Sequence, residues 1–233
     1  MENNNTDTGF ATKAVHSGMV EIEGAASTPI FLSSTYRLTD EKYKGWAEGL
    51  HQSVVYSRLS SINSEVVSAK LAALEGAEDA EVFSSGMAAI STTLLTLLSK
   101  GDHIIATPDC YGGTYALLTD ILPRMGIEVT MADIRDPISY QQAIQENTKV
   151  LYVETMTNPT LKVCDLSAMA ELAKENNLIS VVDNTFVSPW SCNPTKMGFD
   201  IVIHSGTKYL GGHSDLTAGF VAGKKTLVAE IFH

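Results

Sequence analysis

The sequence has few cysteines, and long apolar runs are absent from it. Three cysteines, Cys110, Cys164 and Cys192, are scattered through 233 residues, too few for a disulfide framework and too far apart for a zinc site. No apolar run approaches the roughly 20 residues that span a bilayer. Residues 1–13 are polar and contain no apolar signal core. These absences predict a cytoplasmic protein with no metal and no membrane partner.

Positive charge is also scarce. Only 16 Lys and Arg stand against 27 Asp and Glu, for a net charge of −11. A protein that binds nucleic acid neutralises phosphates with Lys and Arg, so the charge argues against a nucleic-acid partner. Hydrophobic residues make up 44% of the chain and charged residues 18%, which is typical of a globular protein rather than a disordered one.

The chain divides into two regions of different composition. Residues 1–62 mix Gly, Ser, Thr and Pro with isolated aromatics and show little periodicity, which predicts an extended N-terminal arm with short helices. The arm is too apolar for a disordered tail, so we expect it to pack on something else, such as another subunit. Residues 63–233 are expected to form one large domain.

In that domain short apolar runs alternate with helical segments. The apolar runs are Ala80–Phe83, His103–Ala106, Glu128–Met131, Val150–Val153, Ile179–Val182, Ile201–His204 and Ala218–Ala222. The helical segments are Gly86–Leu98, Thr114–Arg124, Ile138–Glu146 and Leu166–Asn176. Apolar runs bounded by helices are typical of a parallel sheet covered on both faces. The pattern predicts a doubly wound α/β domain with its ligands at the carboxyl ends of the strands.

Two of these strand ends carry residues that suit a charged ligand. Gly86 and Met87 follow one run and open a helix, where backbone N–H groups and the helix dipole favour an anion; an ordinary tight turn is the alternative. Asp183 ends another run. It could bind a metal, cap a helix or hold a cationic ring nitrogen. No His or Glu stands nearby at a ligand spacing, so the metal is the weakest of the three.

Two further strand ends suit a carbonyl compound with an aromatic ring. Lys208 follows the run Ile201–His204, where burial would lower the cost of losing its proton, as a Schiff-base lysine requires. Ser205 and Thr207 flank it with hydroxyls that suit a phosphate. Tyr111 follows the run His103–Ala106 and could stack on a planar ring. A surface lysine and a loop aromatic that covers the core are the alternatives.

Together these four features fit one cofactor. An anion-binding turn, a stacking aromatic, a carboxylate for a ring nitrogen and a lysine for a carbonyl are what pyridoxal 5′-phosphate (PLP) requires. Asp183 would have to stay ionised so that the ring nitrogen stays protonated and the ring can take up electrons.

The sequence resembles the Cys/Met-metabolism family of PLP enzymes from about Thr12 to Gly223. The motifs that carry the resemblance occur in family order: Tyr56-Ser-Arg58, Ser84-Ser-Gly-Met-Ala88, Tyr111-Gly-Gly-Thr114, Glu154-Thr-Met-Thr-Asn-Pro159, Val182-Asp-Asn-Thr-Phe186, Ser205-Gly-Thr-Lys208 and Gly212-His-Ser-Asp215. The family includes cystathionine γ-synthase, cystathionine β- and γ-lyases, methionine γ-lyase and O-acetylhomoserine sulfhydrylase. The resemblance implies the aspartate aminotransferase-like fold (fold type I), with residues 63–233 as its PLP-binding large domain.

The resemblance also implies a role for each motif residue. Lys208 would bind PLP covalently and move protons, Asp183 would pair with the pyridine nitrogen, and Tyr111 would stack on the ring and act near the leaving group. The phosphate would be held by Gly86, Met87, Ser205 and Thr207, with Asn158 near the ring hydroxyl and Glu154 and Thr185 close by. Tyr56 and Arg58 would reach the phosphate of a neighbouring subunit, in a homodimer or a homotetramer.

Three departures from the family pattern stand out. Ser61, Ile62 and Asn63 replace the usual Asn-Pro-Thr after the Tyr-x-Arg motif, which removes a rigidifying proline. Methionine γ-lyases typically carry a cysteine shortly after the stacking tyrosine, where this sequence has glycines. The sequence ends at His233, whereas family members continue into a substrate domain of roughly 100–150 residues. That domain, with its carboxylate-binding arginine, is therefore expected to be absent.

The resemblance favours an enzyme of transsulfuration that acts on a small amino-acid substrate. We expect a PLP-dependent carbon–sulfur lyase of cystathionine γ-lyase type. A γ-replacing cystathionine γ-synthase or O-acetylhomoserine sulfhydrylase is the alternative within the family. A non-catalytic PLP-binding remnant or split subunit is the alternative from another class, and a plain aminotransferase is disfavoured by the Tyr-x-Arg and Ser-Gly-Thr-Lys motifs.

Overall fold

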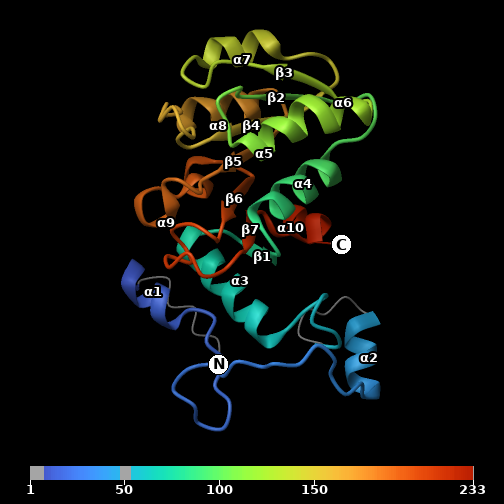
Figure 1. Ribbon diagram of the computed structural model, residues 1–233, viewed down its shortest axis with the longest axis vertical. Coiled ribbons are helices and arrows are strands. Elements are labelled where there is room, and N and C mark those ends of the chain that lie inside the picture. The colour runs from blue at the N-terminus through green and yellow to red at the C-terminus, as the bar shows by residue number, and fades with distance from the viewer. Residues whose placement is uncertain (1–7, 48–53, 233) are drawn as a thin grey trace. The chain divides into compact units, whose positions relative to one another are not determined.

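The computed structural model describes residues 8–47 and 54–232 (Figure 1). The chain forms two compact units, residues 1–73 and 74–233, and each is considered by itself. No helix among the described residues is long and apolar enough to cross a membrane.

The first unit is a helical arm with extended connections. It contains α1 (Phe10–His16), α2 (Asp40–Ala47) and most of α3 (Ile62–Glu75). Asn63 joins the arm to α3, since its side chain accepts a hydrogen bond from the Phe31 amide at 2.8 Å and donates one to the Pro29 carbonyl at 2.9 Å. The substituted Ser-Ile-Asn segment thus supplies its own side-chain contacts to the arm.

The second unit is built on one mixed sheet. Among the described residues its strands are β1 (Asp79–Phe83), β2 (His103–Ala106), β3 (Glu128–Met131), β4 (Thr148–Glu154), β5 (Ile179–Asp183), β6 (Ile201–Ser205) and β7 (Gly219–Gly223). Their order is β1-β7-β6-β5-β4-β2-β3. β7 is antiparallel to both of its neighbours and the other pairs are parallel. The predicted mostly parallel sheet is confirmed.

Helices and helical turns connect the strands. They are α4 (Gly86–Leu97), α5 (Gly112–Ala116), the π-helical turn η1 (Leu117–Ile121), α6 (Leu122–Arg124), α7 (Pro137–Ala143), α8 (Leu166–Glu175), α9 (Ser188–Ser191), the 3₁₀ turn η2 (Pro194–Met197) and α10 (Lys225–Phe232). Side chains cap several of them at the start: Ser85 accepts from the Ala88 amide of α4, and Asp165 from the Ala168 amide of α8, both at 3.1 Å.

Alternating side chains of the strands build two cores, one on each face of the sheet. Val150 and Tyr152 of β4 belong to the core that α4 and α10 cover. Leu151 and Val153 of the same strand belong to the core that α8 covers. All four are fully buried, which explains why the strands read as unbroken apolar runs.

One predicted helix ends earlier than expected. The sequence pattern extends the helix from Ile138 to Glu146, but α7 ends at Ala143. Ile144 has an extended backbone, and the next amide, that of Gln145, donates to the hydroxyl of Thr148 at 2.8 Å. This side-chain turn competes with the helix and leads the chain directly into β4.

Gly219→Ala is expected to destabilise the second unit. A Cβ at Gly219 would lie 1.9 Å from the carbonyl oxygen of Ser85, so the backbone of β7 or of the β1–α4 turn would have to shift, at a cost of about 1–3 kcal/mol. Gly112→Ala is the matched control, because a Cβ there meets nothing within 4 Å. Thermal unfolding followed by circular dichroism measures both, and equal midpoints would contradict the expectation.

Candidate functional site

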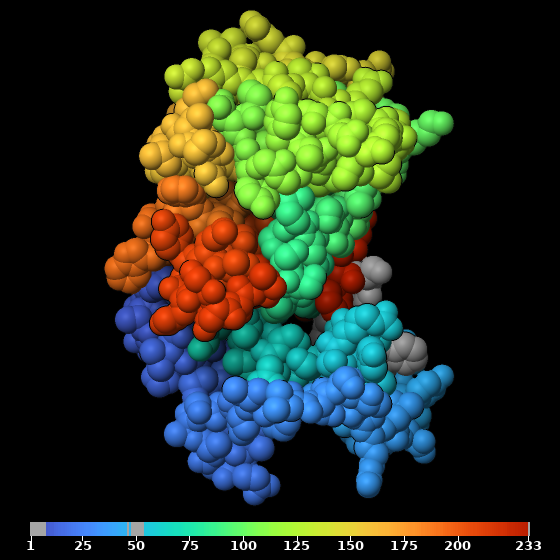
Figure 2. All heavy atoms as spheres, viewed as in Figure 1, coloured from blue at the N-terminus to red at the C-terminus, as the bar shows by residue number. Residues whose placement is uncertain are grey.

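A cavity of about 750 Å³ opens at the carboxyl ends of β1, β4, β5 and β6. Nine of the predicted site residues line it: Gly86, Met87, Tyr111, Asn158, Asp183, Thr185, Ser205, Thr207 and Lys208. Figure 2 shows the loop that follows β6, in orange-red, next to the green surface of α4 on one side of this unit. The sheet therefore brings together residues that are up to 122 positions apart, from Gly86 to Lys208.

The remaining two predicted site residues belong to the first unit. Tyr56 forms an isolated β-bridge with Thr35, and the Arg58 guanidinium lies 5.5 Å from the centre of the Tyr56 ring, a cation–π distance. Their predicted contact with a neighbouring subunit's phosphate stays a prediction.

Asp183 is the buried acid of the cavity. It ends β5, is 8% exposed, and its Oδ1 accepts hydrogen bonds from the Thr185 amide at 3.0 Å and the Thr185 hydroxyl at 2.5 Å. The Thr185 hydroxyl in turn accepts from the Ser205 amide at 2.7 Å. A chain of hydrogen bonds thus connects the acid at the end of β5 to the turn after β6.

Burial raises the pKa of Asp183, and the hydrogen bonds from Thr185 and the charge of His204 oppose that rise. None of the ion pairs among the described residues includes Asp183. Both hydrogen bonds from Thr185 reach the same oxygen of Asp183, Oδ1. A buried carboxyl of this kind at a cavity wall suits a ligand that brings a cationic N–H group.

Glu154 is a second buried acid beside the first. It ends β4 directly opposite Asp183 in the parallel pairing and is 4% exposed. Its Oε1 accepts a hydrogen bond from the Tyr111 amide at 2.8 Å. Burial, and secondarily the charge of Asp183, raise the pKa of Glu154 to about 8, although backbone hydrogen bonds from Tyr111 and Asn158 oppose the shift. Glu154 therefore fixes the loop that carries Tyr111, and its carboxyl holds a proton to higher pH than a free carboxyl does.

The start of α4 lines the cavity with Gly86 and Met87. The first amides of a helix have no intrahelical partner, and here they belong to Gly86 and Met87. A Cβ at Gly86 would lie 2.7 Å from the Ser205 Cβ and 3.0 Å from its hydroxyl. Glycine is therefore required for the helix start to approach the end of β6, where the Ser205 hydroxyl lies close to it.

Lys208 lines the cavity from the turn after β6. Its amide donates to the Ser205 carbonyl at 3.2 Å, and its carbonyl accepts from Gly212 at 2.8 Å. The side chain is exposed, so the burial that the sequence predicts for Lys208 is not provided within this chain. The neighbouring Thr207 hydroxyl accepts a hydrogen bond from the Ala218 amide at 3.2 Å, which fixes the turn from its other side.

The cavity also contains residues that the sequence reasoning did not single out as site residues. Phe186 and Tyr209 both line it, and their rings meet edge to face with centroids 6.3 Å apart. Each directly follows a predicted residue, Phe186 after Thr185 and Tyr209 after Lys208, so proximity to the motifs was the available signal. Among the described residues, no three His, Cys, Asp or Glu side chains gather as metal ligands would.

Comparison with known proteins identifies a family that this chain matches. A family model described as Cys/Met metabolism PLP-dependent enzyme matches residues 11–233. Among curated proteins, the L-methionine gamma-lyase of Porphyromonas gingivalis is 42% identical over 226 residues, which cover 96% of this chain and 57% of that protein. The cystathionine gamma-lyase of Bacillus subtilis is 42% identical over 224 residues, or 95% and 57% of the two chains.

Solved structures agree with the sequence matches. A cystathionine gamma-lyase from Lactobacillus plantarum, complexed with L-serine, superposes with a TM-score of 0.88 at 40% identity, over 97% of this chain and 57% of that one. The metB protein of Corynebacterium glutamicum gives a TM-score of 0.90 at 37% identity. The chain thus spans about 57% of the length of these relatives.

Glu154→Gln is expected to make the stability of the cofactor-free protein less sensitive to pH. In the folded state the pKa of Glu154 is raised from 4.5 to about 8, so the fold holds this proton to higher pH than the unfolded chain does. The linked stability is full below about pH 4.5 and is lost as the pH rises to about 8. Glutamine does not titrate, and its amide oxygen can still accept from Tyr111.

Urea unfolding across that pH range measures the effect. Glu171→Gln, on an exposed position of α8, is the matched control and should follow the wild type. If Glu154→Gln and the wild type lose stability in parallel over this range, the assignment of the pH dependence to Glu154 is wrong.

Proposed function

The chain belongs to the Cys/Met-metabolism PLP-dependent enzymes, and on that premise we propose that it forms the cofactor site of a carbon–sulfur lyase of cystathionine γ-lyase type. The observation that carries the proposal is the single cavity in which Lys208, Asp183 and the start of α4 meet. These groups supply an amine, a buried acid and an anion site on one surface, which is the set that PLP needs.

PLP, when bound, supplies a carbonyl that reacts with amines and a ring that takes up electrons from the substrate's α-carbon. Asp183 would hold the ring nitrogen in its protonated form, because a cation beside the buried carboxylate stabilises both charges. The Gly86 and Met87 amides, with the Ser205 and Thr207 side chains, would bind the phosphate. Asn158, at the cavity wall, would lie beside the ring hydroxyl.

Lys208 and Tyr111 would move the protons of the reaction. The Lys208 amine lies on a flexible side chain at the cavity and is suited to take a proton from the substrate's α-carbon and return it elsewhere. Tyr111 is 49% exposed while Glu154 fixes its backbone, so its ring can cover a planar ligand and its hydroxyl can face the departing sulfur group.

The sequence after Tyr111 favours a cystathionine lyase over a methionine lyase. Gly112 and Gly113 follow Tyr111 directly, and a Cβ at Gly113 would lie 2.8 Å from the Tyr111 ring and 2.9 Å from the Met87 sulfur. A larger side chain, such as a cysteine, therefore does not fit at that position without a shift. A γ-replacing synthase or sulfhydrylase uses the same cofactor groups and is the alternative.

The first unit is proposed to contact a neighbouring subunit in a homodimer or homotetramer. Ile30 and Leu32 of the arm are 81% and 96% exposed, and large apolar side chains at such exposure are typical of an interaction surface. In this arrangement Tyr56 and Arg58 would approach the partner's cofactor phosphate.

Lys208→Ala tests the proposal directly. We expect the wild-type chain with added PLP to show the visible absorption band of lysine-bound cofactor, and Lys208→Ala to lose it. Lys225→Ala, which changes an exposed lysine at the start of α10, should keep the band. A wild type without the band would rule out the cofactor site.

Asp183→Asn is expected to lower the release of ammonia and ketoacid from cystathionine by about 100-fold or more, because the asparagine cannot hold the ring nitrogen protonated. Activity is measured for the wild type and the variant side by side, and the residues proposed to bind the phosphate are unchanged in both. A wild type that binds PLP but releases no product from cystathionine, homocysteine or cysteine would favour the non-catalytic alternative, and synthesis from an activated homoserine would favour the γ-replacing enzyme.

A further inference from the structure

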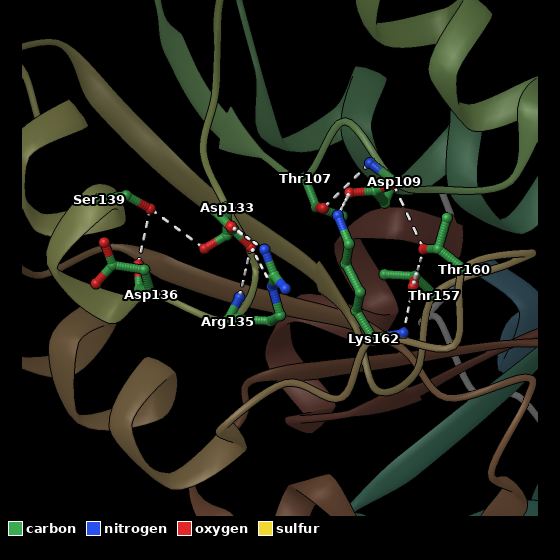
Figure 3. Close-up of polar contacts among 9 residues, drawn as sticks. All are labelled: Thr107, Asp109, Asp133, Arg135, Asp136, Ser139, Thr157, Thr160 and Lys162. Carbon is green, nitrogen blue, oxygen red and sulfur yellow. Dashed lines mark hydrogen bonds and ion pairs between the residues drawn. The ribbon is translucent and has the colours of Figure 1, made fainter.

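Two loops at the cavity are joined by an ion pair. The loop between β2 and α5 ends in Tyr111, and the loop between β4 and α8 carries Asn158; both residues line the cavity. Lys162 of the second loop reaches Asp109 of the first, with Nζ 2.5 Å from Oδ2 (Figure 3). The pair therefore connects two segments that are 53 positions apart in sequence.

The second loop is a closed turn that fixes the base of Lys162. The Thr157 amide donates to the Lys162 carbonyl at 3.0 Å, and the Lys162 amide donates back to the Thr157 hydroxyl at 2.9 Å. The Thr157 and Thr160 hydroxyls lie 2.7 Å apart. Asn158 directly follows Thr157. The position of Asn158 therefore depends on the position of Lys162 through the two hydrogen bonds between Thr157 and Lys162.

Two hydrogen bonds hold Asp109 in place, one within the first loop and one from the second loop. The Asp109 amide donates to the Thr107 hydroxyl at 3.3 Å, and its Oδ1 accepts from the Thr160 hydroxyl at 3.4 Å. One residue, the buried Cys110, separates Asp109 from Tyr111. Asp109 therefore anchors the loop on one side of Tyr111's backbone, and Glu154 anchors it at the Tyr111 amide.

A second ion pair in the same view does not connect two distant segments of the chain. Arg135 pairs with Asp133 at 2.8 Å, but the two are two positions apart and their side chains are 59% and 41% exposed. Lys162 and Asp109 are 27% and 24% exposed, so solvent screens their attraction less. Figure 3 shows the two pairs in separate groups of contacts. The hydrogen bonds of the Arg135 pair stay within its own turn, so this pair provides a matched control for an ion pair that does not join the two loops.

We propose that Lys162 and Asp109 are positioning residues that hold Tyr111 and Asn158 in register around the bound cofactor ring. The inference rests on the proposed function, since it requires PLP in the cavity. Neither residue lines the cavity. They act through the two loops, whose separation the ion pair sets.

The experiment measures PLP affinity and the visible circular dichroism of bound PLP, which reports how the ring is held. The variants are Lys162→Met, Asp109→Asn, their combination, the conservative Lys162→Arg, and the control Arg135→Met. Each single neutral variant should weaken PLP binding by roughly 5-fold or more, the equivalent of about one kcal/mol, and reduce the visible signal. The double variant should be no worse than either single one, because both remove the same contact.

Lys162→Arg should keep most of the affinity, and Arg135→Met should behave as the wild type. If the wild type binds PLP while Lys162→Met and Asp109→Asn bind it equally well with an unchanged visible signal, the positioning role is wrong. Fully additive effects in the double variant would contradict it too. A lower midpoint of thermal unfolding with unchanged affinity and signal would mean a structural role only. Failure of the wild type to bind PLP would instead refute the proposed function.

Discussion

The arrangement of the site depends on two buried carboxyl groups that lie side by side. Asp183 and Glu154 face each other across neighbouring parallel strands, and burial opposes the charged form of both. Like charges in a low-dielectric interior repel strongly, so the fold surrounds each acid with donors: the Thr185 amide and hydroxyl for one, the Tyr111 amide for the other. The loops that supply these donors are the loops that shape the cavity. The hydrogen bonds that satisfy the two acids therefore also position the residues around them.

A second buried network of hydrogen bonds supports the carboxyl ends of β4 and β5. Glu75 and His204 are fully buried and lie 2.6 Å apart. The Asn184 amide group donates to the same Glu75 oxygen at 3.2 Å, and its own oxygen accepts from the Thr155 hydroxyl at 2.8 Å. Since Asn184 follows Asp183 and Thr155 follows Glu154, one cluster holds the ends of both strands. The charge of His204 also lowers the pKa of Asp183, so the network has an electrostatic effect as well as a mechanical one.

The fold was accessible from the sequence because the inner strands of the sheet, β2, β4, β5, β6 and β7, are buried on both faces. Such strands read as apolar runs, and all seven predicted runs fall on strands of the sheet, with ends that differ by at most two residues. Nine predicted site residues share one cavity because parallel strands end at a common edge. The bond from Ser205 to Thr185 and the ion pair between Lys162 and Asp109 depend on register between distant segments, and no local pattern encodes that. The exposure of Lys208 was missed for the same reason, since burial depends on neighbours and not on the preceding strand.

Burial of Asp183 would also couple the binding of a cationic ligand to protonation. Burial raises the pKa of Asp183 despite the opposing charge of His204, so this carboxyl binds a proton more readily than a free carboxyl does. A ligand with a protonated ring nitrogen supplies a further positive charge and lowers that pKa, and by linkage the ionised carboxylate must favour the protonated ligand by the same free energy. Ligand binding to the folded state alone then stabilises the fold by mass action. The electrostatic cost of burying Asp183 would thus favour a cationic ring over a neutral one in this cavity, and the hydrogen bonds of Thr185 limit how large that cost becomes.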